Sequence, residues 1–151
     1  MRRPRRLLAI ASSGGHWTQL QRLRPAFSGF DVAFVSMYDS YAETVAPARY
    51  YTVPDASRLD LAKFVPVFAK ALKIIMKERP RVIVTTGSMP MLAFILLGRL
   101  TGAKTLWVDS IANSERMSSS GRMARKLAHR TLSQWPQVAA AEGVECWGAV
   151  I

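Results

Sequence analysis

The stretch that decides the fold is Arg6-Leu-Leu-Ala-Ile-Ala-Ser-Ser-Gly-Gly-His16, near the start of a chain of 151 residues. The apolar run 7–11 is followed by a turn of serines and glycines, and a helical pattern begins near Trp17. A short apolar run that ends in a glycine turn before a helix is typical of a strand–loop–helix unit in a parallel sheet. We therefore expect this loop at the carboxyl end of a buried strand.

The same alternation of short apolar runs and helical patterns continues along the chain. It predicts strands over 6–11, 31–36, 50–53, 81–85, 104–108, 131–134 and 145–150. It predicts helices over 17–26, 60–78, 88–101, 121–130 and 136–142. Without an internal repeat or a linker, residues 1–151 are expected to form a single α/β domain, a Rossmann-like parallel sheet with helices on both faces.

The predicted helix 60–78 carries an apolar face and a lysine-rich one. The side chains expected on the apolar face are Phe64, Phe68, Leu72, Ile75 and Met76. The lysines expected mostly off that face are Lys63, Lys70, Lys73 and Lys77. Pro66 predicts either a kink or the true first turn of this helix.

Composition and net charge limit the classes of protein and of partner that this chain can represent. With 50% hydrophobic and 21% charged residues, the chain is of the packed globular class. The net charge of +11 indicates a polyanion, an anionic ligand or an anionic membrane surface as partner. The single Cys146 excludes an intrachain disulfide and indicates a cytoplasmic setting, and no Cys/His spacing suggests a metal site. The uncharged run 89–97 is about half of the roughly 20 residues that cross a bilayer.

Three loops are expected at the carboxyl ends of the strands, where open parallel sheets bind ligands: 12–17, 86–90 and 109–121. The first and second have the glycines and hydroxyls that hold phosphate at a helix start. Together they predict a clamp for a diphosphate, with the binding residues Ser12, Ser13, Gly14, Gly15, His16, Thr86, Gly87 and Ser88. The alternatives are a tight turn without ligand for the first loop and simple helix capping for Ser88.

His16 and two carboxylates are the candidates for catalysis. A neutral imidazole at His16 can act as general base toward a hydroxyl, although a turn cap and a phosphate ligand are equally open. The third loop holds Asp109 and Glu115 and is dense in polar residues. Such loops line a site or an interface, which suggests a cleft-facing or partner-facing role for Ser110, Asn113, Ser118, Ser120 and Gly121.

A basic helix follows the third loop. Helical spacing places Arg122, Arg125, Lys126 and Arg130 within reach of one broad face. Contact with an anionic membrane and a merely solvated face are the two interpretations.

Four stretches carry a family resemblance, in this order: SSGGH (12–16), TGSMP (86–90), WVDSIANSERMSSSG (107–121) and SQWP (133–136). They resemble the polysaccharide-biosynthesis subunits related to asparagine-linked glycosylation protein fourteen. The residues that match the family pattern are Gly14, Gly15, His16, Gly87, Asp109, Ser110, Glu115, Ser118, Ser120, Gly121, Gln134, Trp135 and Pro136. Asp109 stands where many members have Glu.

The resemblance implies the acceptor-side, N-terminal-type half of a GT-B glycosyltransferase. Such a chain binds no cofactor of its own. It pairs with a nucleotide-sugar-binding subunit that holds a UDP-sugar, and the pair transfers the sugar to a polyprenyl-diphosphate-linked acceptor in exopolysaccharide or lipid-linked oligosaccharide assembly. Alone it is expected to be inactive. Eukaryotic members add a transmembrane helix, and this chain has only residues 1–6 in its place. It is therefore expected on the inner face of the cell membrane, with an attachment that is peripheral or borrowed from a partner.

A nucleic-acid-binding module is the alternative, motivated by the charge and four tryptophans. It predicts aromatic residues interleaved with the basic ones. The tryptophans instead lie away from the arginine-rich stretch 122–130, so no nucleic-acid partner is expected.

Overall fold

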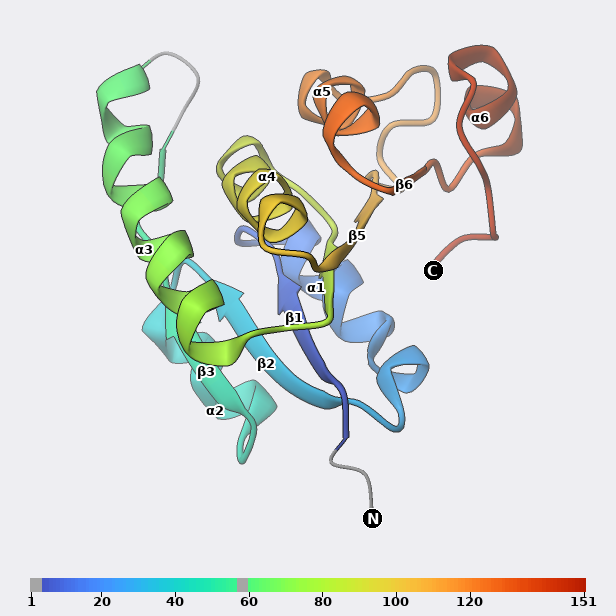
Figure 1. Cartoon of the computed structure of the whole chain (residues 1–151). Helices are drawn as coiled ribbons and strands as arrows, with labels where there is room; N and C mark the ends of the chain where they lie inside the picture. Colours follow the sequence, from blue (N-terminus) through green and yellow to red (C-terminus); the bar gives the residue numbers. More distant parts are fainter. Residues whose placement is uncertain (1–3, 57–59) are drawn as a thin grey trace.

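The computed structural model describes residues 4–56 and 60–151 (Figure 1). It contains one parallel sheet of six strands, β1 (Arg6–Ile10), β2 (Asp31–Ser36), β3 (Arg49–Thr52), β4 (Val82–Thr85), β5 (Lys104–Val108) and β6 (Arg130–Leu132). The spatial order is β3-β2-β1-β4-β5-β6, with all neighbours parallel. This order, in which the chain reverses direction across the sheet after β3, confirms the predicted Rossmann-like α/β fold.

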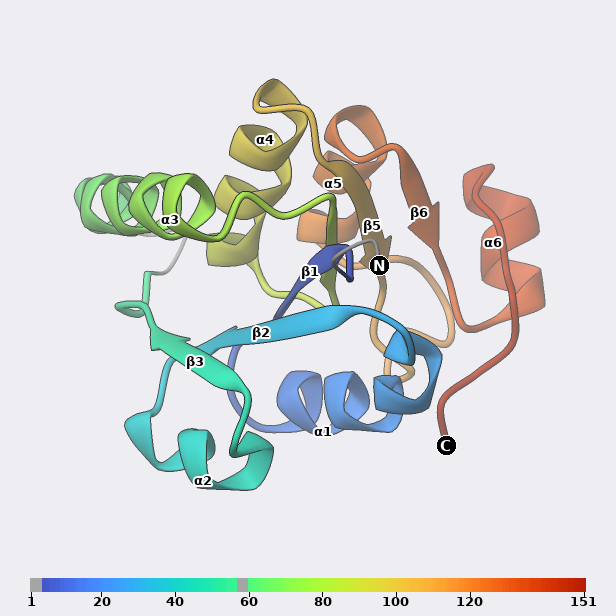
Figure 2. The ribbon, with the colours of Figure 1, turned by 60° about the horizontal axis from the view of Figure 1, so that its bottom comes forward.

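Helices cover both faces of the sheet, as predicted (Figure 2). The α-helices are α1 (Gly15–Arg22), α2 (Ala42–Val45), α3 (Phe64–Glu78), α4 (Leu92–Leu100), α5 (Ser119–Leu127) and α6 (Pro136–Glu142). Short 3-10 turns are η1 (Arg24–Phe27), η2 (Asp39–Tyr41), η3 (Leu61–Lys63) and η4 (Met89–Met91). In the described ranges, every helix is too short or too polar to cross a membrane.

The strand β1 shows why its sequence is apolar after Arg6. Leu8 and Ile10 pack in the cluster beneath α3, α4 and α5, whereas Leu7 and Ala9 pack in the cluster with α1 on the other face. Successive side chains of a strand point to opposite faces, so a strand with both faces covered is apolar at consecutive positions.

The seventh predicted strand, 145–150, is wrong for the described structure. Only Glu145 pairs with the sheet, through a bridge to Leu132. The chain then turns at Gly148, whose φ is +109°, and the Val150 amide donates to the Gln134 side chain 2.8 Å away. A buried amide side chain therefore takes the hydrogen bond that a strand partner would have taken.

The predicted apolar face of the helix 60–78 is also partly wrong. Its buried residues are Val67, Ala71, Ile74, Ile75 and Glu78. Leu72 and Met76 are exposed by 44% and 56%. The helix has apolar side chains on two adjacent stripes, and periodicity alone does not say which stripe faces the sheet. Pro66 lies in the first turn of α3, where a proline is tolerated.

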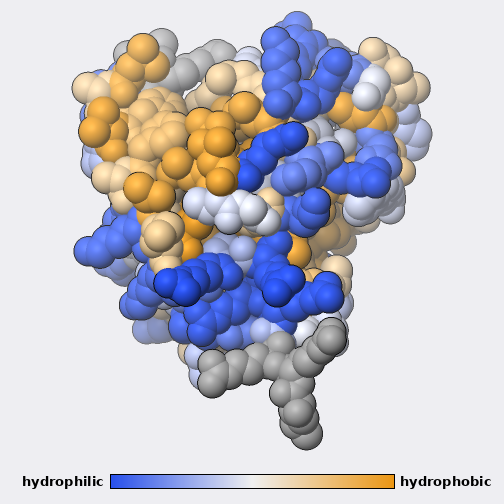
Figure 3. All heavy atoms as spheres, in the orientation of Figure 1, coloured by the Kyte–Doolittle hydropathy of each residue, from blue (hydrophilic) through white to orange (hydrophobic). Residues whose placement is uncertain are grey.

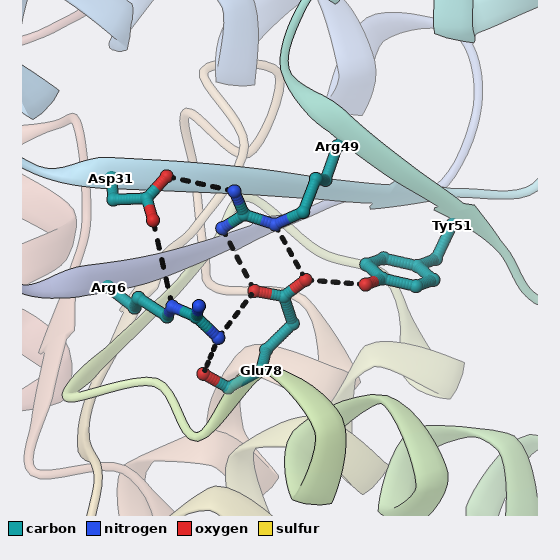
Figure 4. Close-up of polar contacts among 5 residues, drawn as sticks. All are labelled: Arg6, Asp31, Arg49, Tyr51 and Glu78. Carbon is teal, nitrogen blue, oxygen red and sulfur yellow. Dashed lines mark hydrogen bonds and ion pairs between the residues drawn. The ribbon is translucent and has the colours of Figure 1, made fainter.

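A network of charged side chains lies at the amino ends of the strands, the edge opposite the three predicted loops (Figure 4). Arg49 donates two hydrogen bonds to the buried Glu78 carboxylate, at 2.9 and 3.0 Å, and the Tyr51 hydroxyl donates a third. Arg6 forms ion pairs with both Glu78 and Asp31, at 3.8 and 3.6 Å. These contacts join the starts of β1, β2 and β3 to the end of α3.

Candidate functional site

The loops that follow β1 and β4 meet where the order of the strands reverses. The Ser12 amide donates to the Gly87 carbonyl at 3.0 Å, and the Thr86 hydroxyl donates to the His16 carbonyl at 2.6 Å. His16 Nδ1 lies 2.8 Å from the Thr86 carbonyl oxygen. The structure thus joins the two loops that the sequence analysis assigned to a diphosphate.

Gly87 permits this contact. Its φ is +114°, and a Cβ built at this position lies 2.9 Å from the His16 ring. Any other residue would combine a strained backbone with a steric clash against the imidazole. The glycine is therefore required for His16 to lie against the second loop.

The contact with Thr86 selects the tautomer of His16. A carbonyl oxygen only accepts hydrogen bonds, so Nδ1 carries the proton. In the neutral ring the lone pair then lies on Nε2. Among the described residues, none makes a hydrogen bond to Nε2. The ring is held in an orientation that suits proton acceptance at Nε2.

The start of α1 presents backbone amides at the same edge. The helix begins at Gly15, two residues before the predicted start, with Gly14 as its N-cap at φ +66°. The first amides of a helix have no acceptor within it. The Gly14 amide donates to the Tyr41 hydroxyl, and nothing lies within 4 Å of a Cβ built on Gly15. Gly15 therefore faces open space, as a ligand at this turn requires.

Ser88 occupies the N-cap position of η4, but its side chain makes no capping hydrogen bond. The capping alternative for Ser88 is therefore wrong. Ser12 is buried, and its carbonyl accepts from the Ser36 hydroxyl, so it supports the loop. Whether either serine contacts a phosphate stays a prediction.

A pocket of about 420 Å³ adjoins the first loop. Its lining residues are Ser13, Met37, Tyr38, Thr52, Val53, Pro54, Asp55 and Lys70. Lys70 comes from α3 and brings a cationic side chain to the loop. The sequence analysis missed this role, because Lys70 is one of four lysines on α3 and only the packing of that helix distinguishes them.

Asp109 is 2% exposed and organises the third loop. Oδ1 accepts from Trp107 Nε1 and the Ser118 hydroxyl, at 3.2 and 2.6 Å. Oδ2 accepts from Asn113 Nδ2 and the Ser118 amide, at 3.1 and 3.0 Å. A Cβ on Gly121 would lie 2.5 Å from Oδ1, so this glycine lets α5 approach the carboxylate. The contacts of Asp109 are those of a residue that positions the loop.

Two buried glutamines tie the third loop to α1. Gln19 Nε2 donates to the Ser110 hydroxyl at 3.1 Å, and Gln19 Oε1 accepts from the Ile111 amide. Gln134 Nε2 donates to Gln19 Oε1 and to the Asp109 carbonyl, at 2.7 and 3.0 Å. Gln19 was not predicted as a site residue; a polar side chain in a helix gives no sign of its burial.

The remaining residues of the third loop differ in burial and in hydrogen bonding. Ser118 caps α5 by accepting from the Gly121 amide, and Ser120 is buried beside it. Glu115 is exposed, and its side chain makes no hydrogen bond or ion pair with any described residue. The catalytic role of Glu115 stays a prediction.

The basic residues of the α5 region are largely paired. Arg122 donates to the Glu142 carboxylate, and Arg125 donates to the main-chain carbonyl of Glu142. Arg130 forms an ion pair with Glu145 at 2.8 Å. Of the four predicted membrane residues, Arg125 and Lys126 lack an ion pair with a described carboxylate, and Arg125 donates only to a main-chain carbonyl.

The predicted helix 121–130 ends at Leu127, so Arg130 lies on β6 and not on the helix face, which corrects the prediction. Arg122 and Arg125 hold α5 against α6, and a membrane role for the four residues stays a prediction.

The profile of the family described as "Oligosaccharide biosynthesis protein Alg14 like" matches residues 31–150. The chain belongs to the Alg14-like family. The matched range contains the second and third loops, whereas the loop with Gly14, Gly15 and His16 precedes it. The predicted resemblance is thus confirmed for most of the chain.

One curated relative and two solved structures place the Alg14-like chain among larger proteins. It is 36% identical over 78 residues to "UDP-N-acetylglucosamine transferase subunit ALG14" of Yarrowia lipolytica, a match that covers 48% of this chain and 36% of the relative. Acinetobacter baumannii MurG has a TM-score of 0.74 at 13% identity, over 89% of this chain and 42% of MurG. The UDP-GlcNAc 2-epimerase of Methanocaldococcus jannaschii has a TM-score of 0.68 at 14% identity, over 93% and 43%.

These structural similarities show the fold alone. The Alg14-like chain has the fold of one Rossmann-like half of a GT-B protein and spans less than half the length of each relative. Across residues 4–56 and 60–151, no three His, Cys, Asp or Glu side chains gather closely enough to hold a metal ion.

Proposed function

We propose that this chain is the acceptor-binding subunit of a two-component glycosyltransferase. A partner subunit holds the nucleotide sugar, and the pair transfers the sugar to a polyprenyl-diphosphate-linked acceptor. The observation that carries the proposal is the meeting of the two glycine loops at the reversal of strand order, where Rossmann-like sheets bind ligands.

The proposed diphosphate lies over the first turn of α1. The helix dipole and the free amides there favour an anion, and Gly15 leaves space for it. Lys70 adds a positive charge from the neighbouring pocket. The turn at Gly87, in the second loop, is proposed to lie on the other side of the diphosphate from α1.

His16 is the proposed general base. Nε2 accepts the proton of the acceptor hydroxyl as that oxygen attacks the anomeric carbon of the donor sugar. The new bond joins the acceptor oxygen to that carbon, and the bond from the carbon to the nucleoside diphosphate breaks. Asp109, through Ser118 and Asn113, positions the loop beside this site.

A partner is required because one Rossmann-like half encloses only one of the two substrates. The proposed donor, a UDP-sugar, is bound by the other half. The proposed location is the cytoplasmic face of the cell membrane, where a lipid-linked acceptor is anchored, and the product serves polysaccharide assembly. Two of the four tryptophans, Trp17 and Trp107, are buried in the core and are not placed to stack on bases, which does not favour nucleic acid.

The purified chain alone is expected to show no sugar transfer, and activity is expected on addition of a nucleotide-sugar-binding subunit of the same organism. The measurement is transfer of radiolabelled sugar from UDP-sugars to a polyprenyl-diphosphate-linked sugar. A pair that forms a stable complex yet transfers nothing from a panel of UDP-sugars contradicts the proposal, as does full turnover by the chain alone.

Lys70→Ala is expected to raise the KM for the acceptor about tenfold while kcat changes less than twofold. The reason is that a cation beside a diphosphate contributes about 1.5–3 kcal/mol when it makes a charged hydrogen bond. Lys73→Ala is the matched control, because Lys73 is exposed on the same helix and does not line the pocket. Equal KM values in the two variants would place the diphosphate away from Lys70.

A further inference from the structure

The pocket of about 420 Å³ beside the first loop lies where three neighbouring strands end. Its walls come from the first loop, from the residues that follow β2, from the end of β3 with the residues after it, and from α3. Ligand pockets typically have volumes of about 300–1,000 Å³, so this pocket is large enough for a small ligand. The proposed function uses Lys70 from this pocket and leaves most of its walls without a ligand.

The walls of the pocket differ in chemistry from the neighbouring surface of α3. Figure 3 shows a hydrophobic area over α3 and α4. Beside Tyr38, the pocket has polar or charged side chains from Ser13, Thr52, Asp55 and Lys70 and apolar ones from Met37, Val53 and Pro54. A ligand that fits both kinds of wall carries hydrogen-bonding groups and C–H surfaces together.

Three polar side chains of the pocket have no partner within the described structure. The side chains of Ser13, Asp55 and Lys70 make no hydrogen bond or ion pair with any described residue. A carboxylate only accepts hydrogen bonds, and an ammonium group only donates them. The Thr52 hydroxyl donates to the Asp39 carboxylate, so its oxygen is left to accept from a ligand. A ligand that meets all of these groups has neighbouring hydroxyls, each of which both donates and accepts.

Two other classes of ligand fit these walls less well. A second phosphate group would be repelled by Asp55. A hydrocarbon chain would take Asp55 and Lys70 out of water without offering a hydrogen bond, which is costly for charged groups. A sugar ring replaces the lost water with its own hydroxyls and places its C–H groups against the apolar side chains.

Tyr38 is an exposed aromatic side chain that is held in place beside the pocket. It is 55% exposed. Its ring packs edge-on against Tyr41, with 5.5 Å between the ring centroids, and Tyr41 stacks on Trp17 at 4.7 Å. The Tyr50 hydroxyl donates to the Tyr38 carbonyl. A tyrosine ring that is fixed before the ligand arrives loses little conformational entropy on binding and offers a flat apolar face.

We propose that this pocket binds the sugar that the diphosphate of the acceptor carries. This inference rests on the proposed function and assigns the sugar part of the same substrate. The Asp55 carboxylate accepts from a sugar hydroxyl, the Tyr38 ring packs on a C–H face of the sugar, and Lys70 marks where sugar and diphosphate join. Ser13 lies three residues before His16, so the pocket holds the sugar beside the loop that carries the proposed base.

The test is calorimetric binding of geranyl diphosphate derivatives to the full chain. The sugar-bearing probes are geranyl diphosphate esters of glucose, galactose and N-acetylglucosamine. The methyl ester of geranyl diphosphate is the reference, because it carries the same negative charge and no sugar. A hydrogen bond to a charged group contributes about tenfold or more in affinity. We therefore expect at least one sugar-bearing probe to bind the parent chain about tenfold more tightly than the methyl ester, or tighter still.

Asp55→Ala is expected to remove most of this gain, while the affinity for the methyl ester stays within about twofold. Glu43→Ala is the matched control: it removes an exposed carboxylate of α2 that does not line the pocket, and the gain should remain. Circular dichroism and thermal unfolding check that each variant is folded.

Tyr38→Ala is expected to weaken binding of the sugar-bearing probe about fivefold, because the aromatic face is lost. Tyr38→Phe keeps the ring and should keep the affinity within about twofold. A gain that is unchanged in either Asp55→Ala or Tyr38→Ala would overturn the inference. So would a parent chain that binds the sugar-bearing probes no more tightly than the methyl ester.

UDP-glucose and UDP-N-acetylglucosamine separate the acceptor sugar from the donor sugar, since donor and acceptor both carry a sugar on a diphosphate. Neither is expected to bind the chain in a way that depends on Asp55. A UDP-sugar whose binding is lost in Asp55→Ala would assign the pocket to the donor and overturn the inference. The failures are distinguishable: absence of sugar transfer by the reconstituted pair contradicts the proposed function, even where the gain from the sugar holds.

Discussion

Replacement of His16 by alanine is expected to lower kcat of the reconstituted pair by about 10²–10⁴-fold, the usual contribution of a general base. The basis is the contact of Nδ1 with the Thr86 carbonyl, which leaves the lone pair on Nε2. The KM for the acceptor should change much less, since proton transfer belongs to the transition state. The measurement is steady-state kinetics with saturating donor.

His16→Asn separates the two roles of this side chain. An asparagine amide can donate to the Thr86 carbonyl, as Nδ1 does, but it has no basic nitrogen. If His16 is the base, the asparagine variant is expected to be as slow as the alanine variant and as stable as the parent. Recovery of kcat to within a few-fold of the parent would show that His16 serves only to join the two loops.

The meeting of the first two loops could be predicted because it follows from topology. A parallel sheet places the carboxyl ends of its strands at one edge, and the glycines at Gly14 and Gly87 mark the turns there. The same glycines and hydroxyls predict that the two loops hold a diphosphate, and that role stays a prediction. The hydrogen bonds between Thr86 and His16 needed the structure, because they join residues 70 positions apart.

The wrong predictions from the sequence share a physical cause. A local pattern of residues does not show which distant residues will form hydrogen bonds or ion pairs with it. The run 145–150 is apolar enough for a strand, but the Gln134 side chain takes the Val150 amide and Gly148 turns the chain away. The spacing of the basic residues after the third loop predicts one helix face, yet Arg130 lies on β6, and the partners Glu142 and Glu145 lie on a different segment. No periodicity within a helix reports such partners.

Asp109 shows the same limit for function. A carboxylate in a polar loop suggests proton transfer, whereas in the structure its oxygens accept four hydrogen bonds. For Lys70 the difference runs the other way. The sequence pattern places this lysine off the apolar face of its helix, whereas in the structure it lines a pocket beside the first loop. In both cases the packing of neighbouring elements decides the contacts of the side chain, which the sequence left open.

Glu78→Gln is expected to reduce the free energy of unfolding by about 3 kcal/mol at pH 7. Loss of one partner from a buried ion pair costs about 3–5 kcal/mol. Arg6 and Arg49, with side chains 46% and 40% exposed, can turn partly to water, which favours the low end of that range. Asp60→Asn is the matched control; it removes an exposed ion pair with Lys63 and should cost less than about 1 kcal/mol. Chemical denaturation measures both.

The pH dependence supplies a second readout. Burial raises the pKa of Glu78, but hydrogen bonds from Arg49 and Tyr51 and the nearby positive charges outweigh burial and hold that pKa below its ordinary value of 4.5. The stabilisation is therefore fully present above about pH 4.5 and is lost as the pH falls through the lower pKa of the folded state. The parent should lose stability in this acid range, and the Glu78→Gln variant should show a flatter profile.

Tyr51 reports on the same network from the alkaline side. Burial, and then its hydrogen bond to the Glu78 carboxylate, raise the pKa of the Tyr51 hydroxyl to about 12. In Glu78→Gln this pKa should fall toward 10, because the negative charge that opposes ionisation is gone. Spectroscopic titration of the tyrosines measures this pKa.

The network lies at the amino ends of the strands, away from the three loops, so kcat of the reconstituted pair should stay unchanged in Glu78→Gln. A large loss of kcat in a folded Glu78→Gln variant would mean that the two edges of the sheet are coupled.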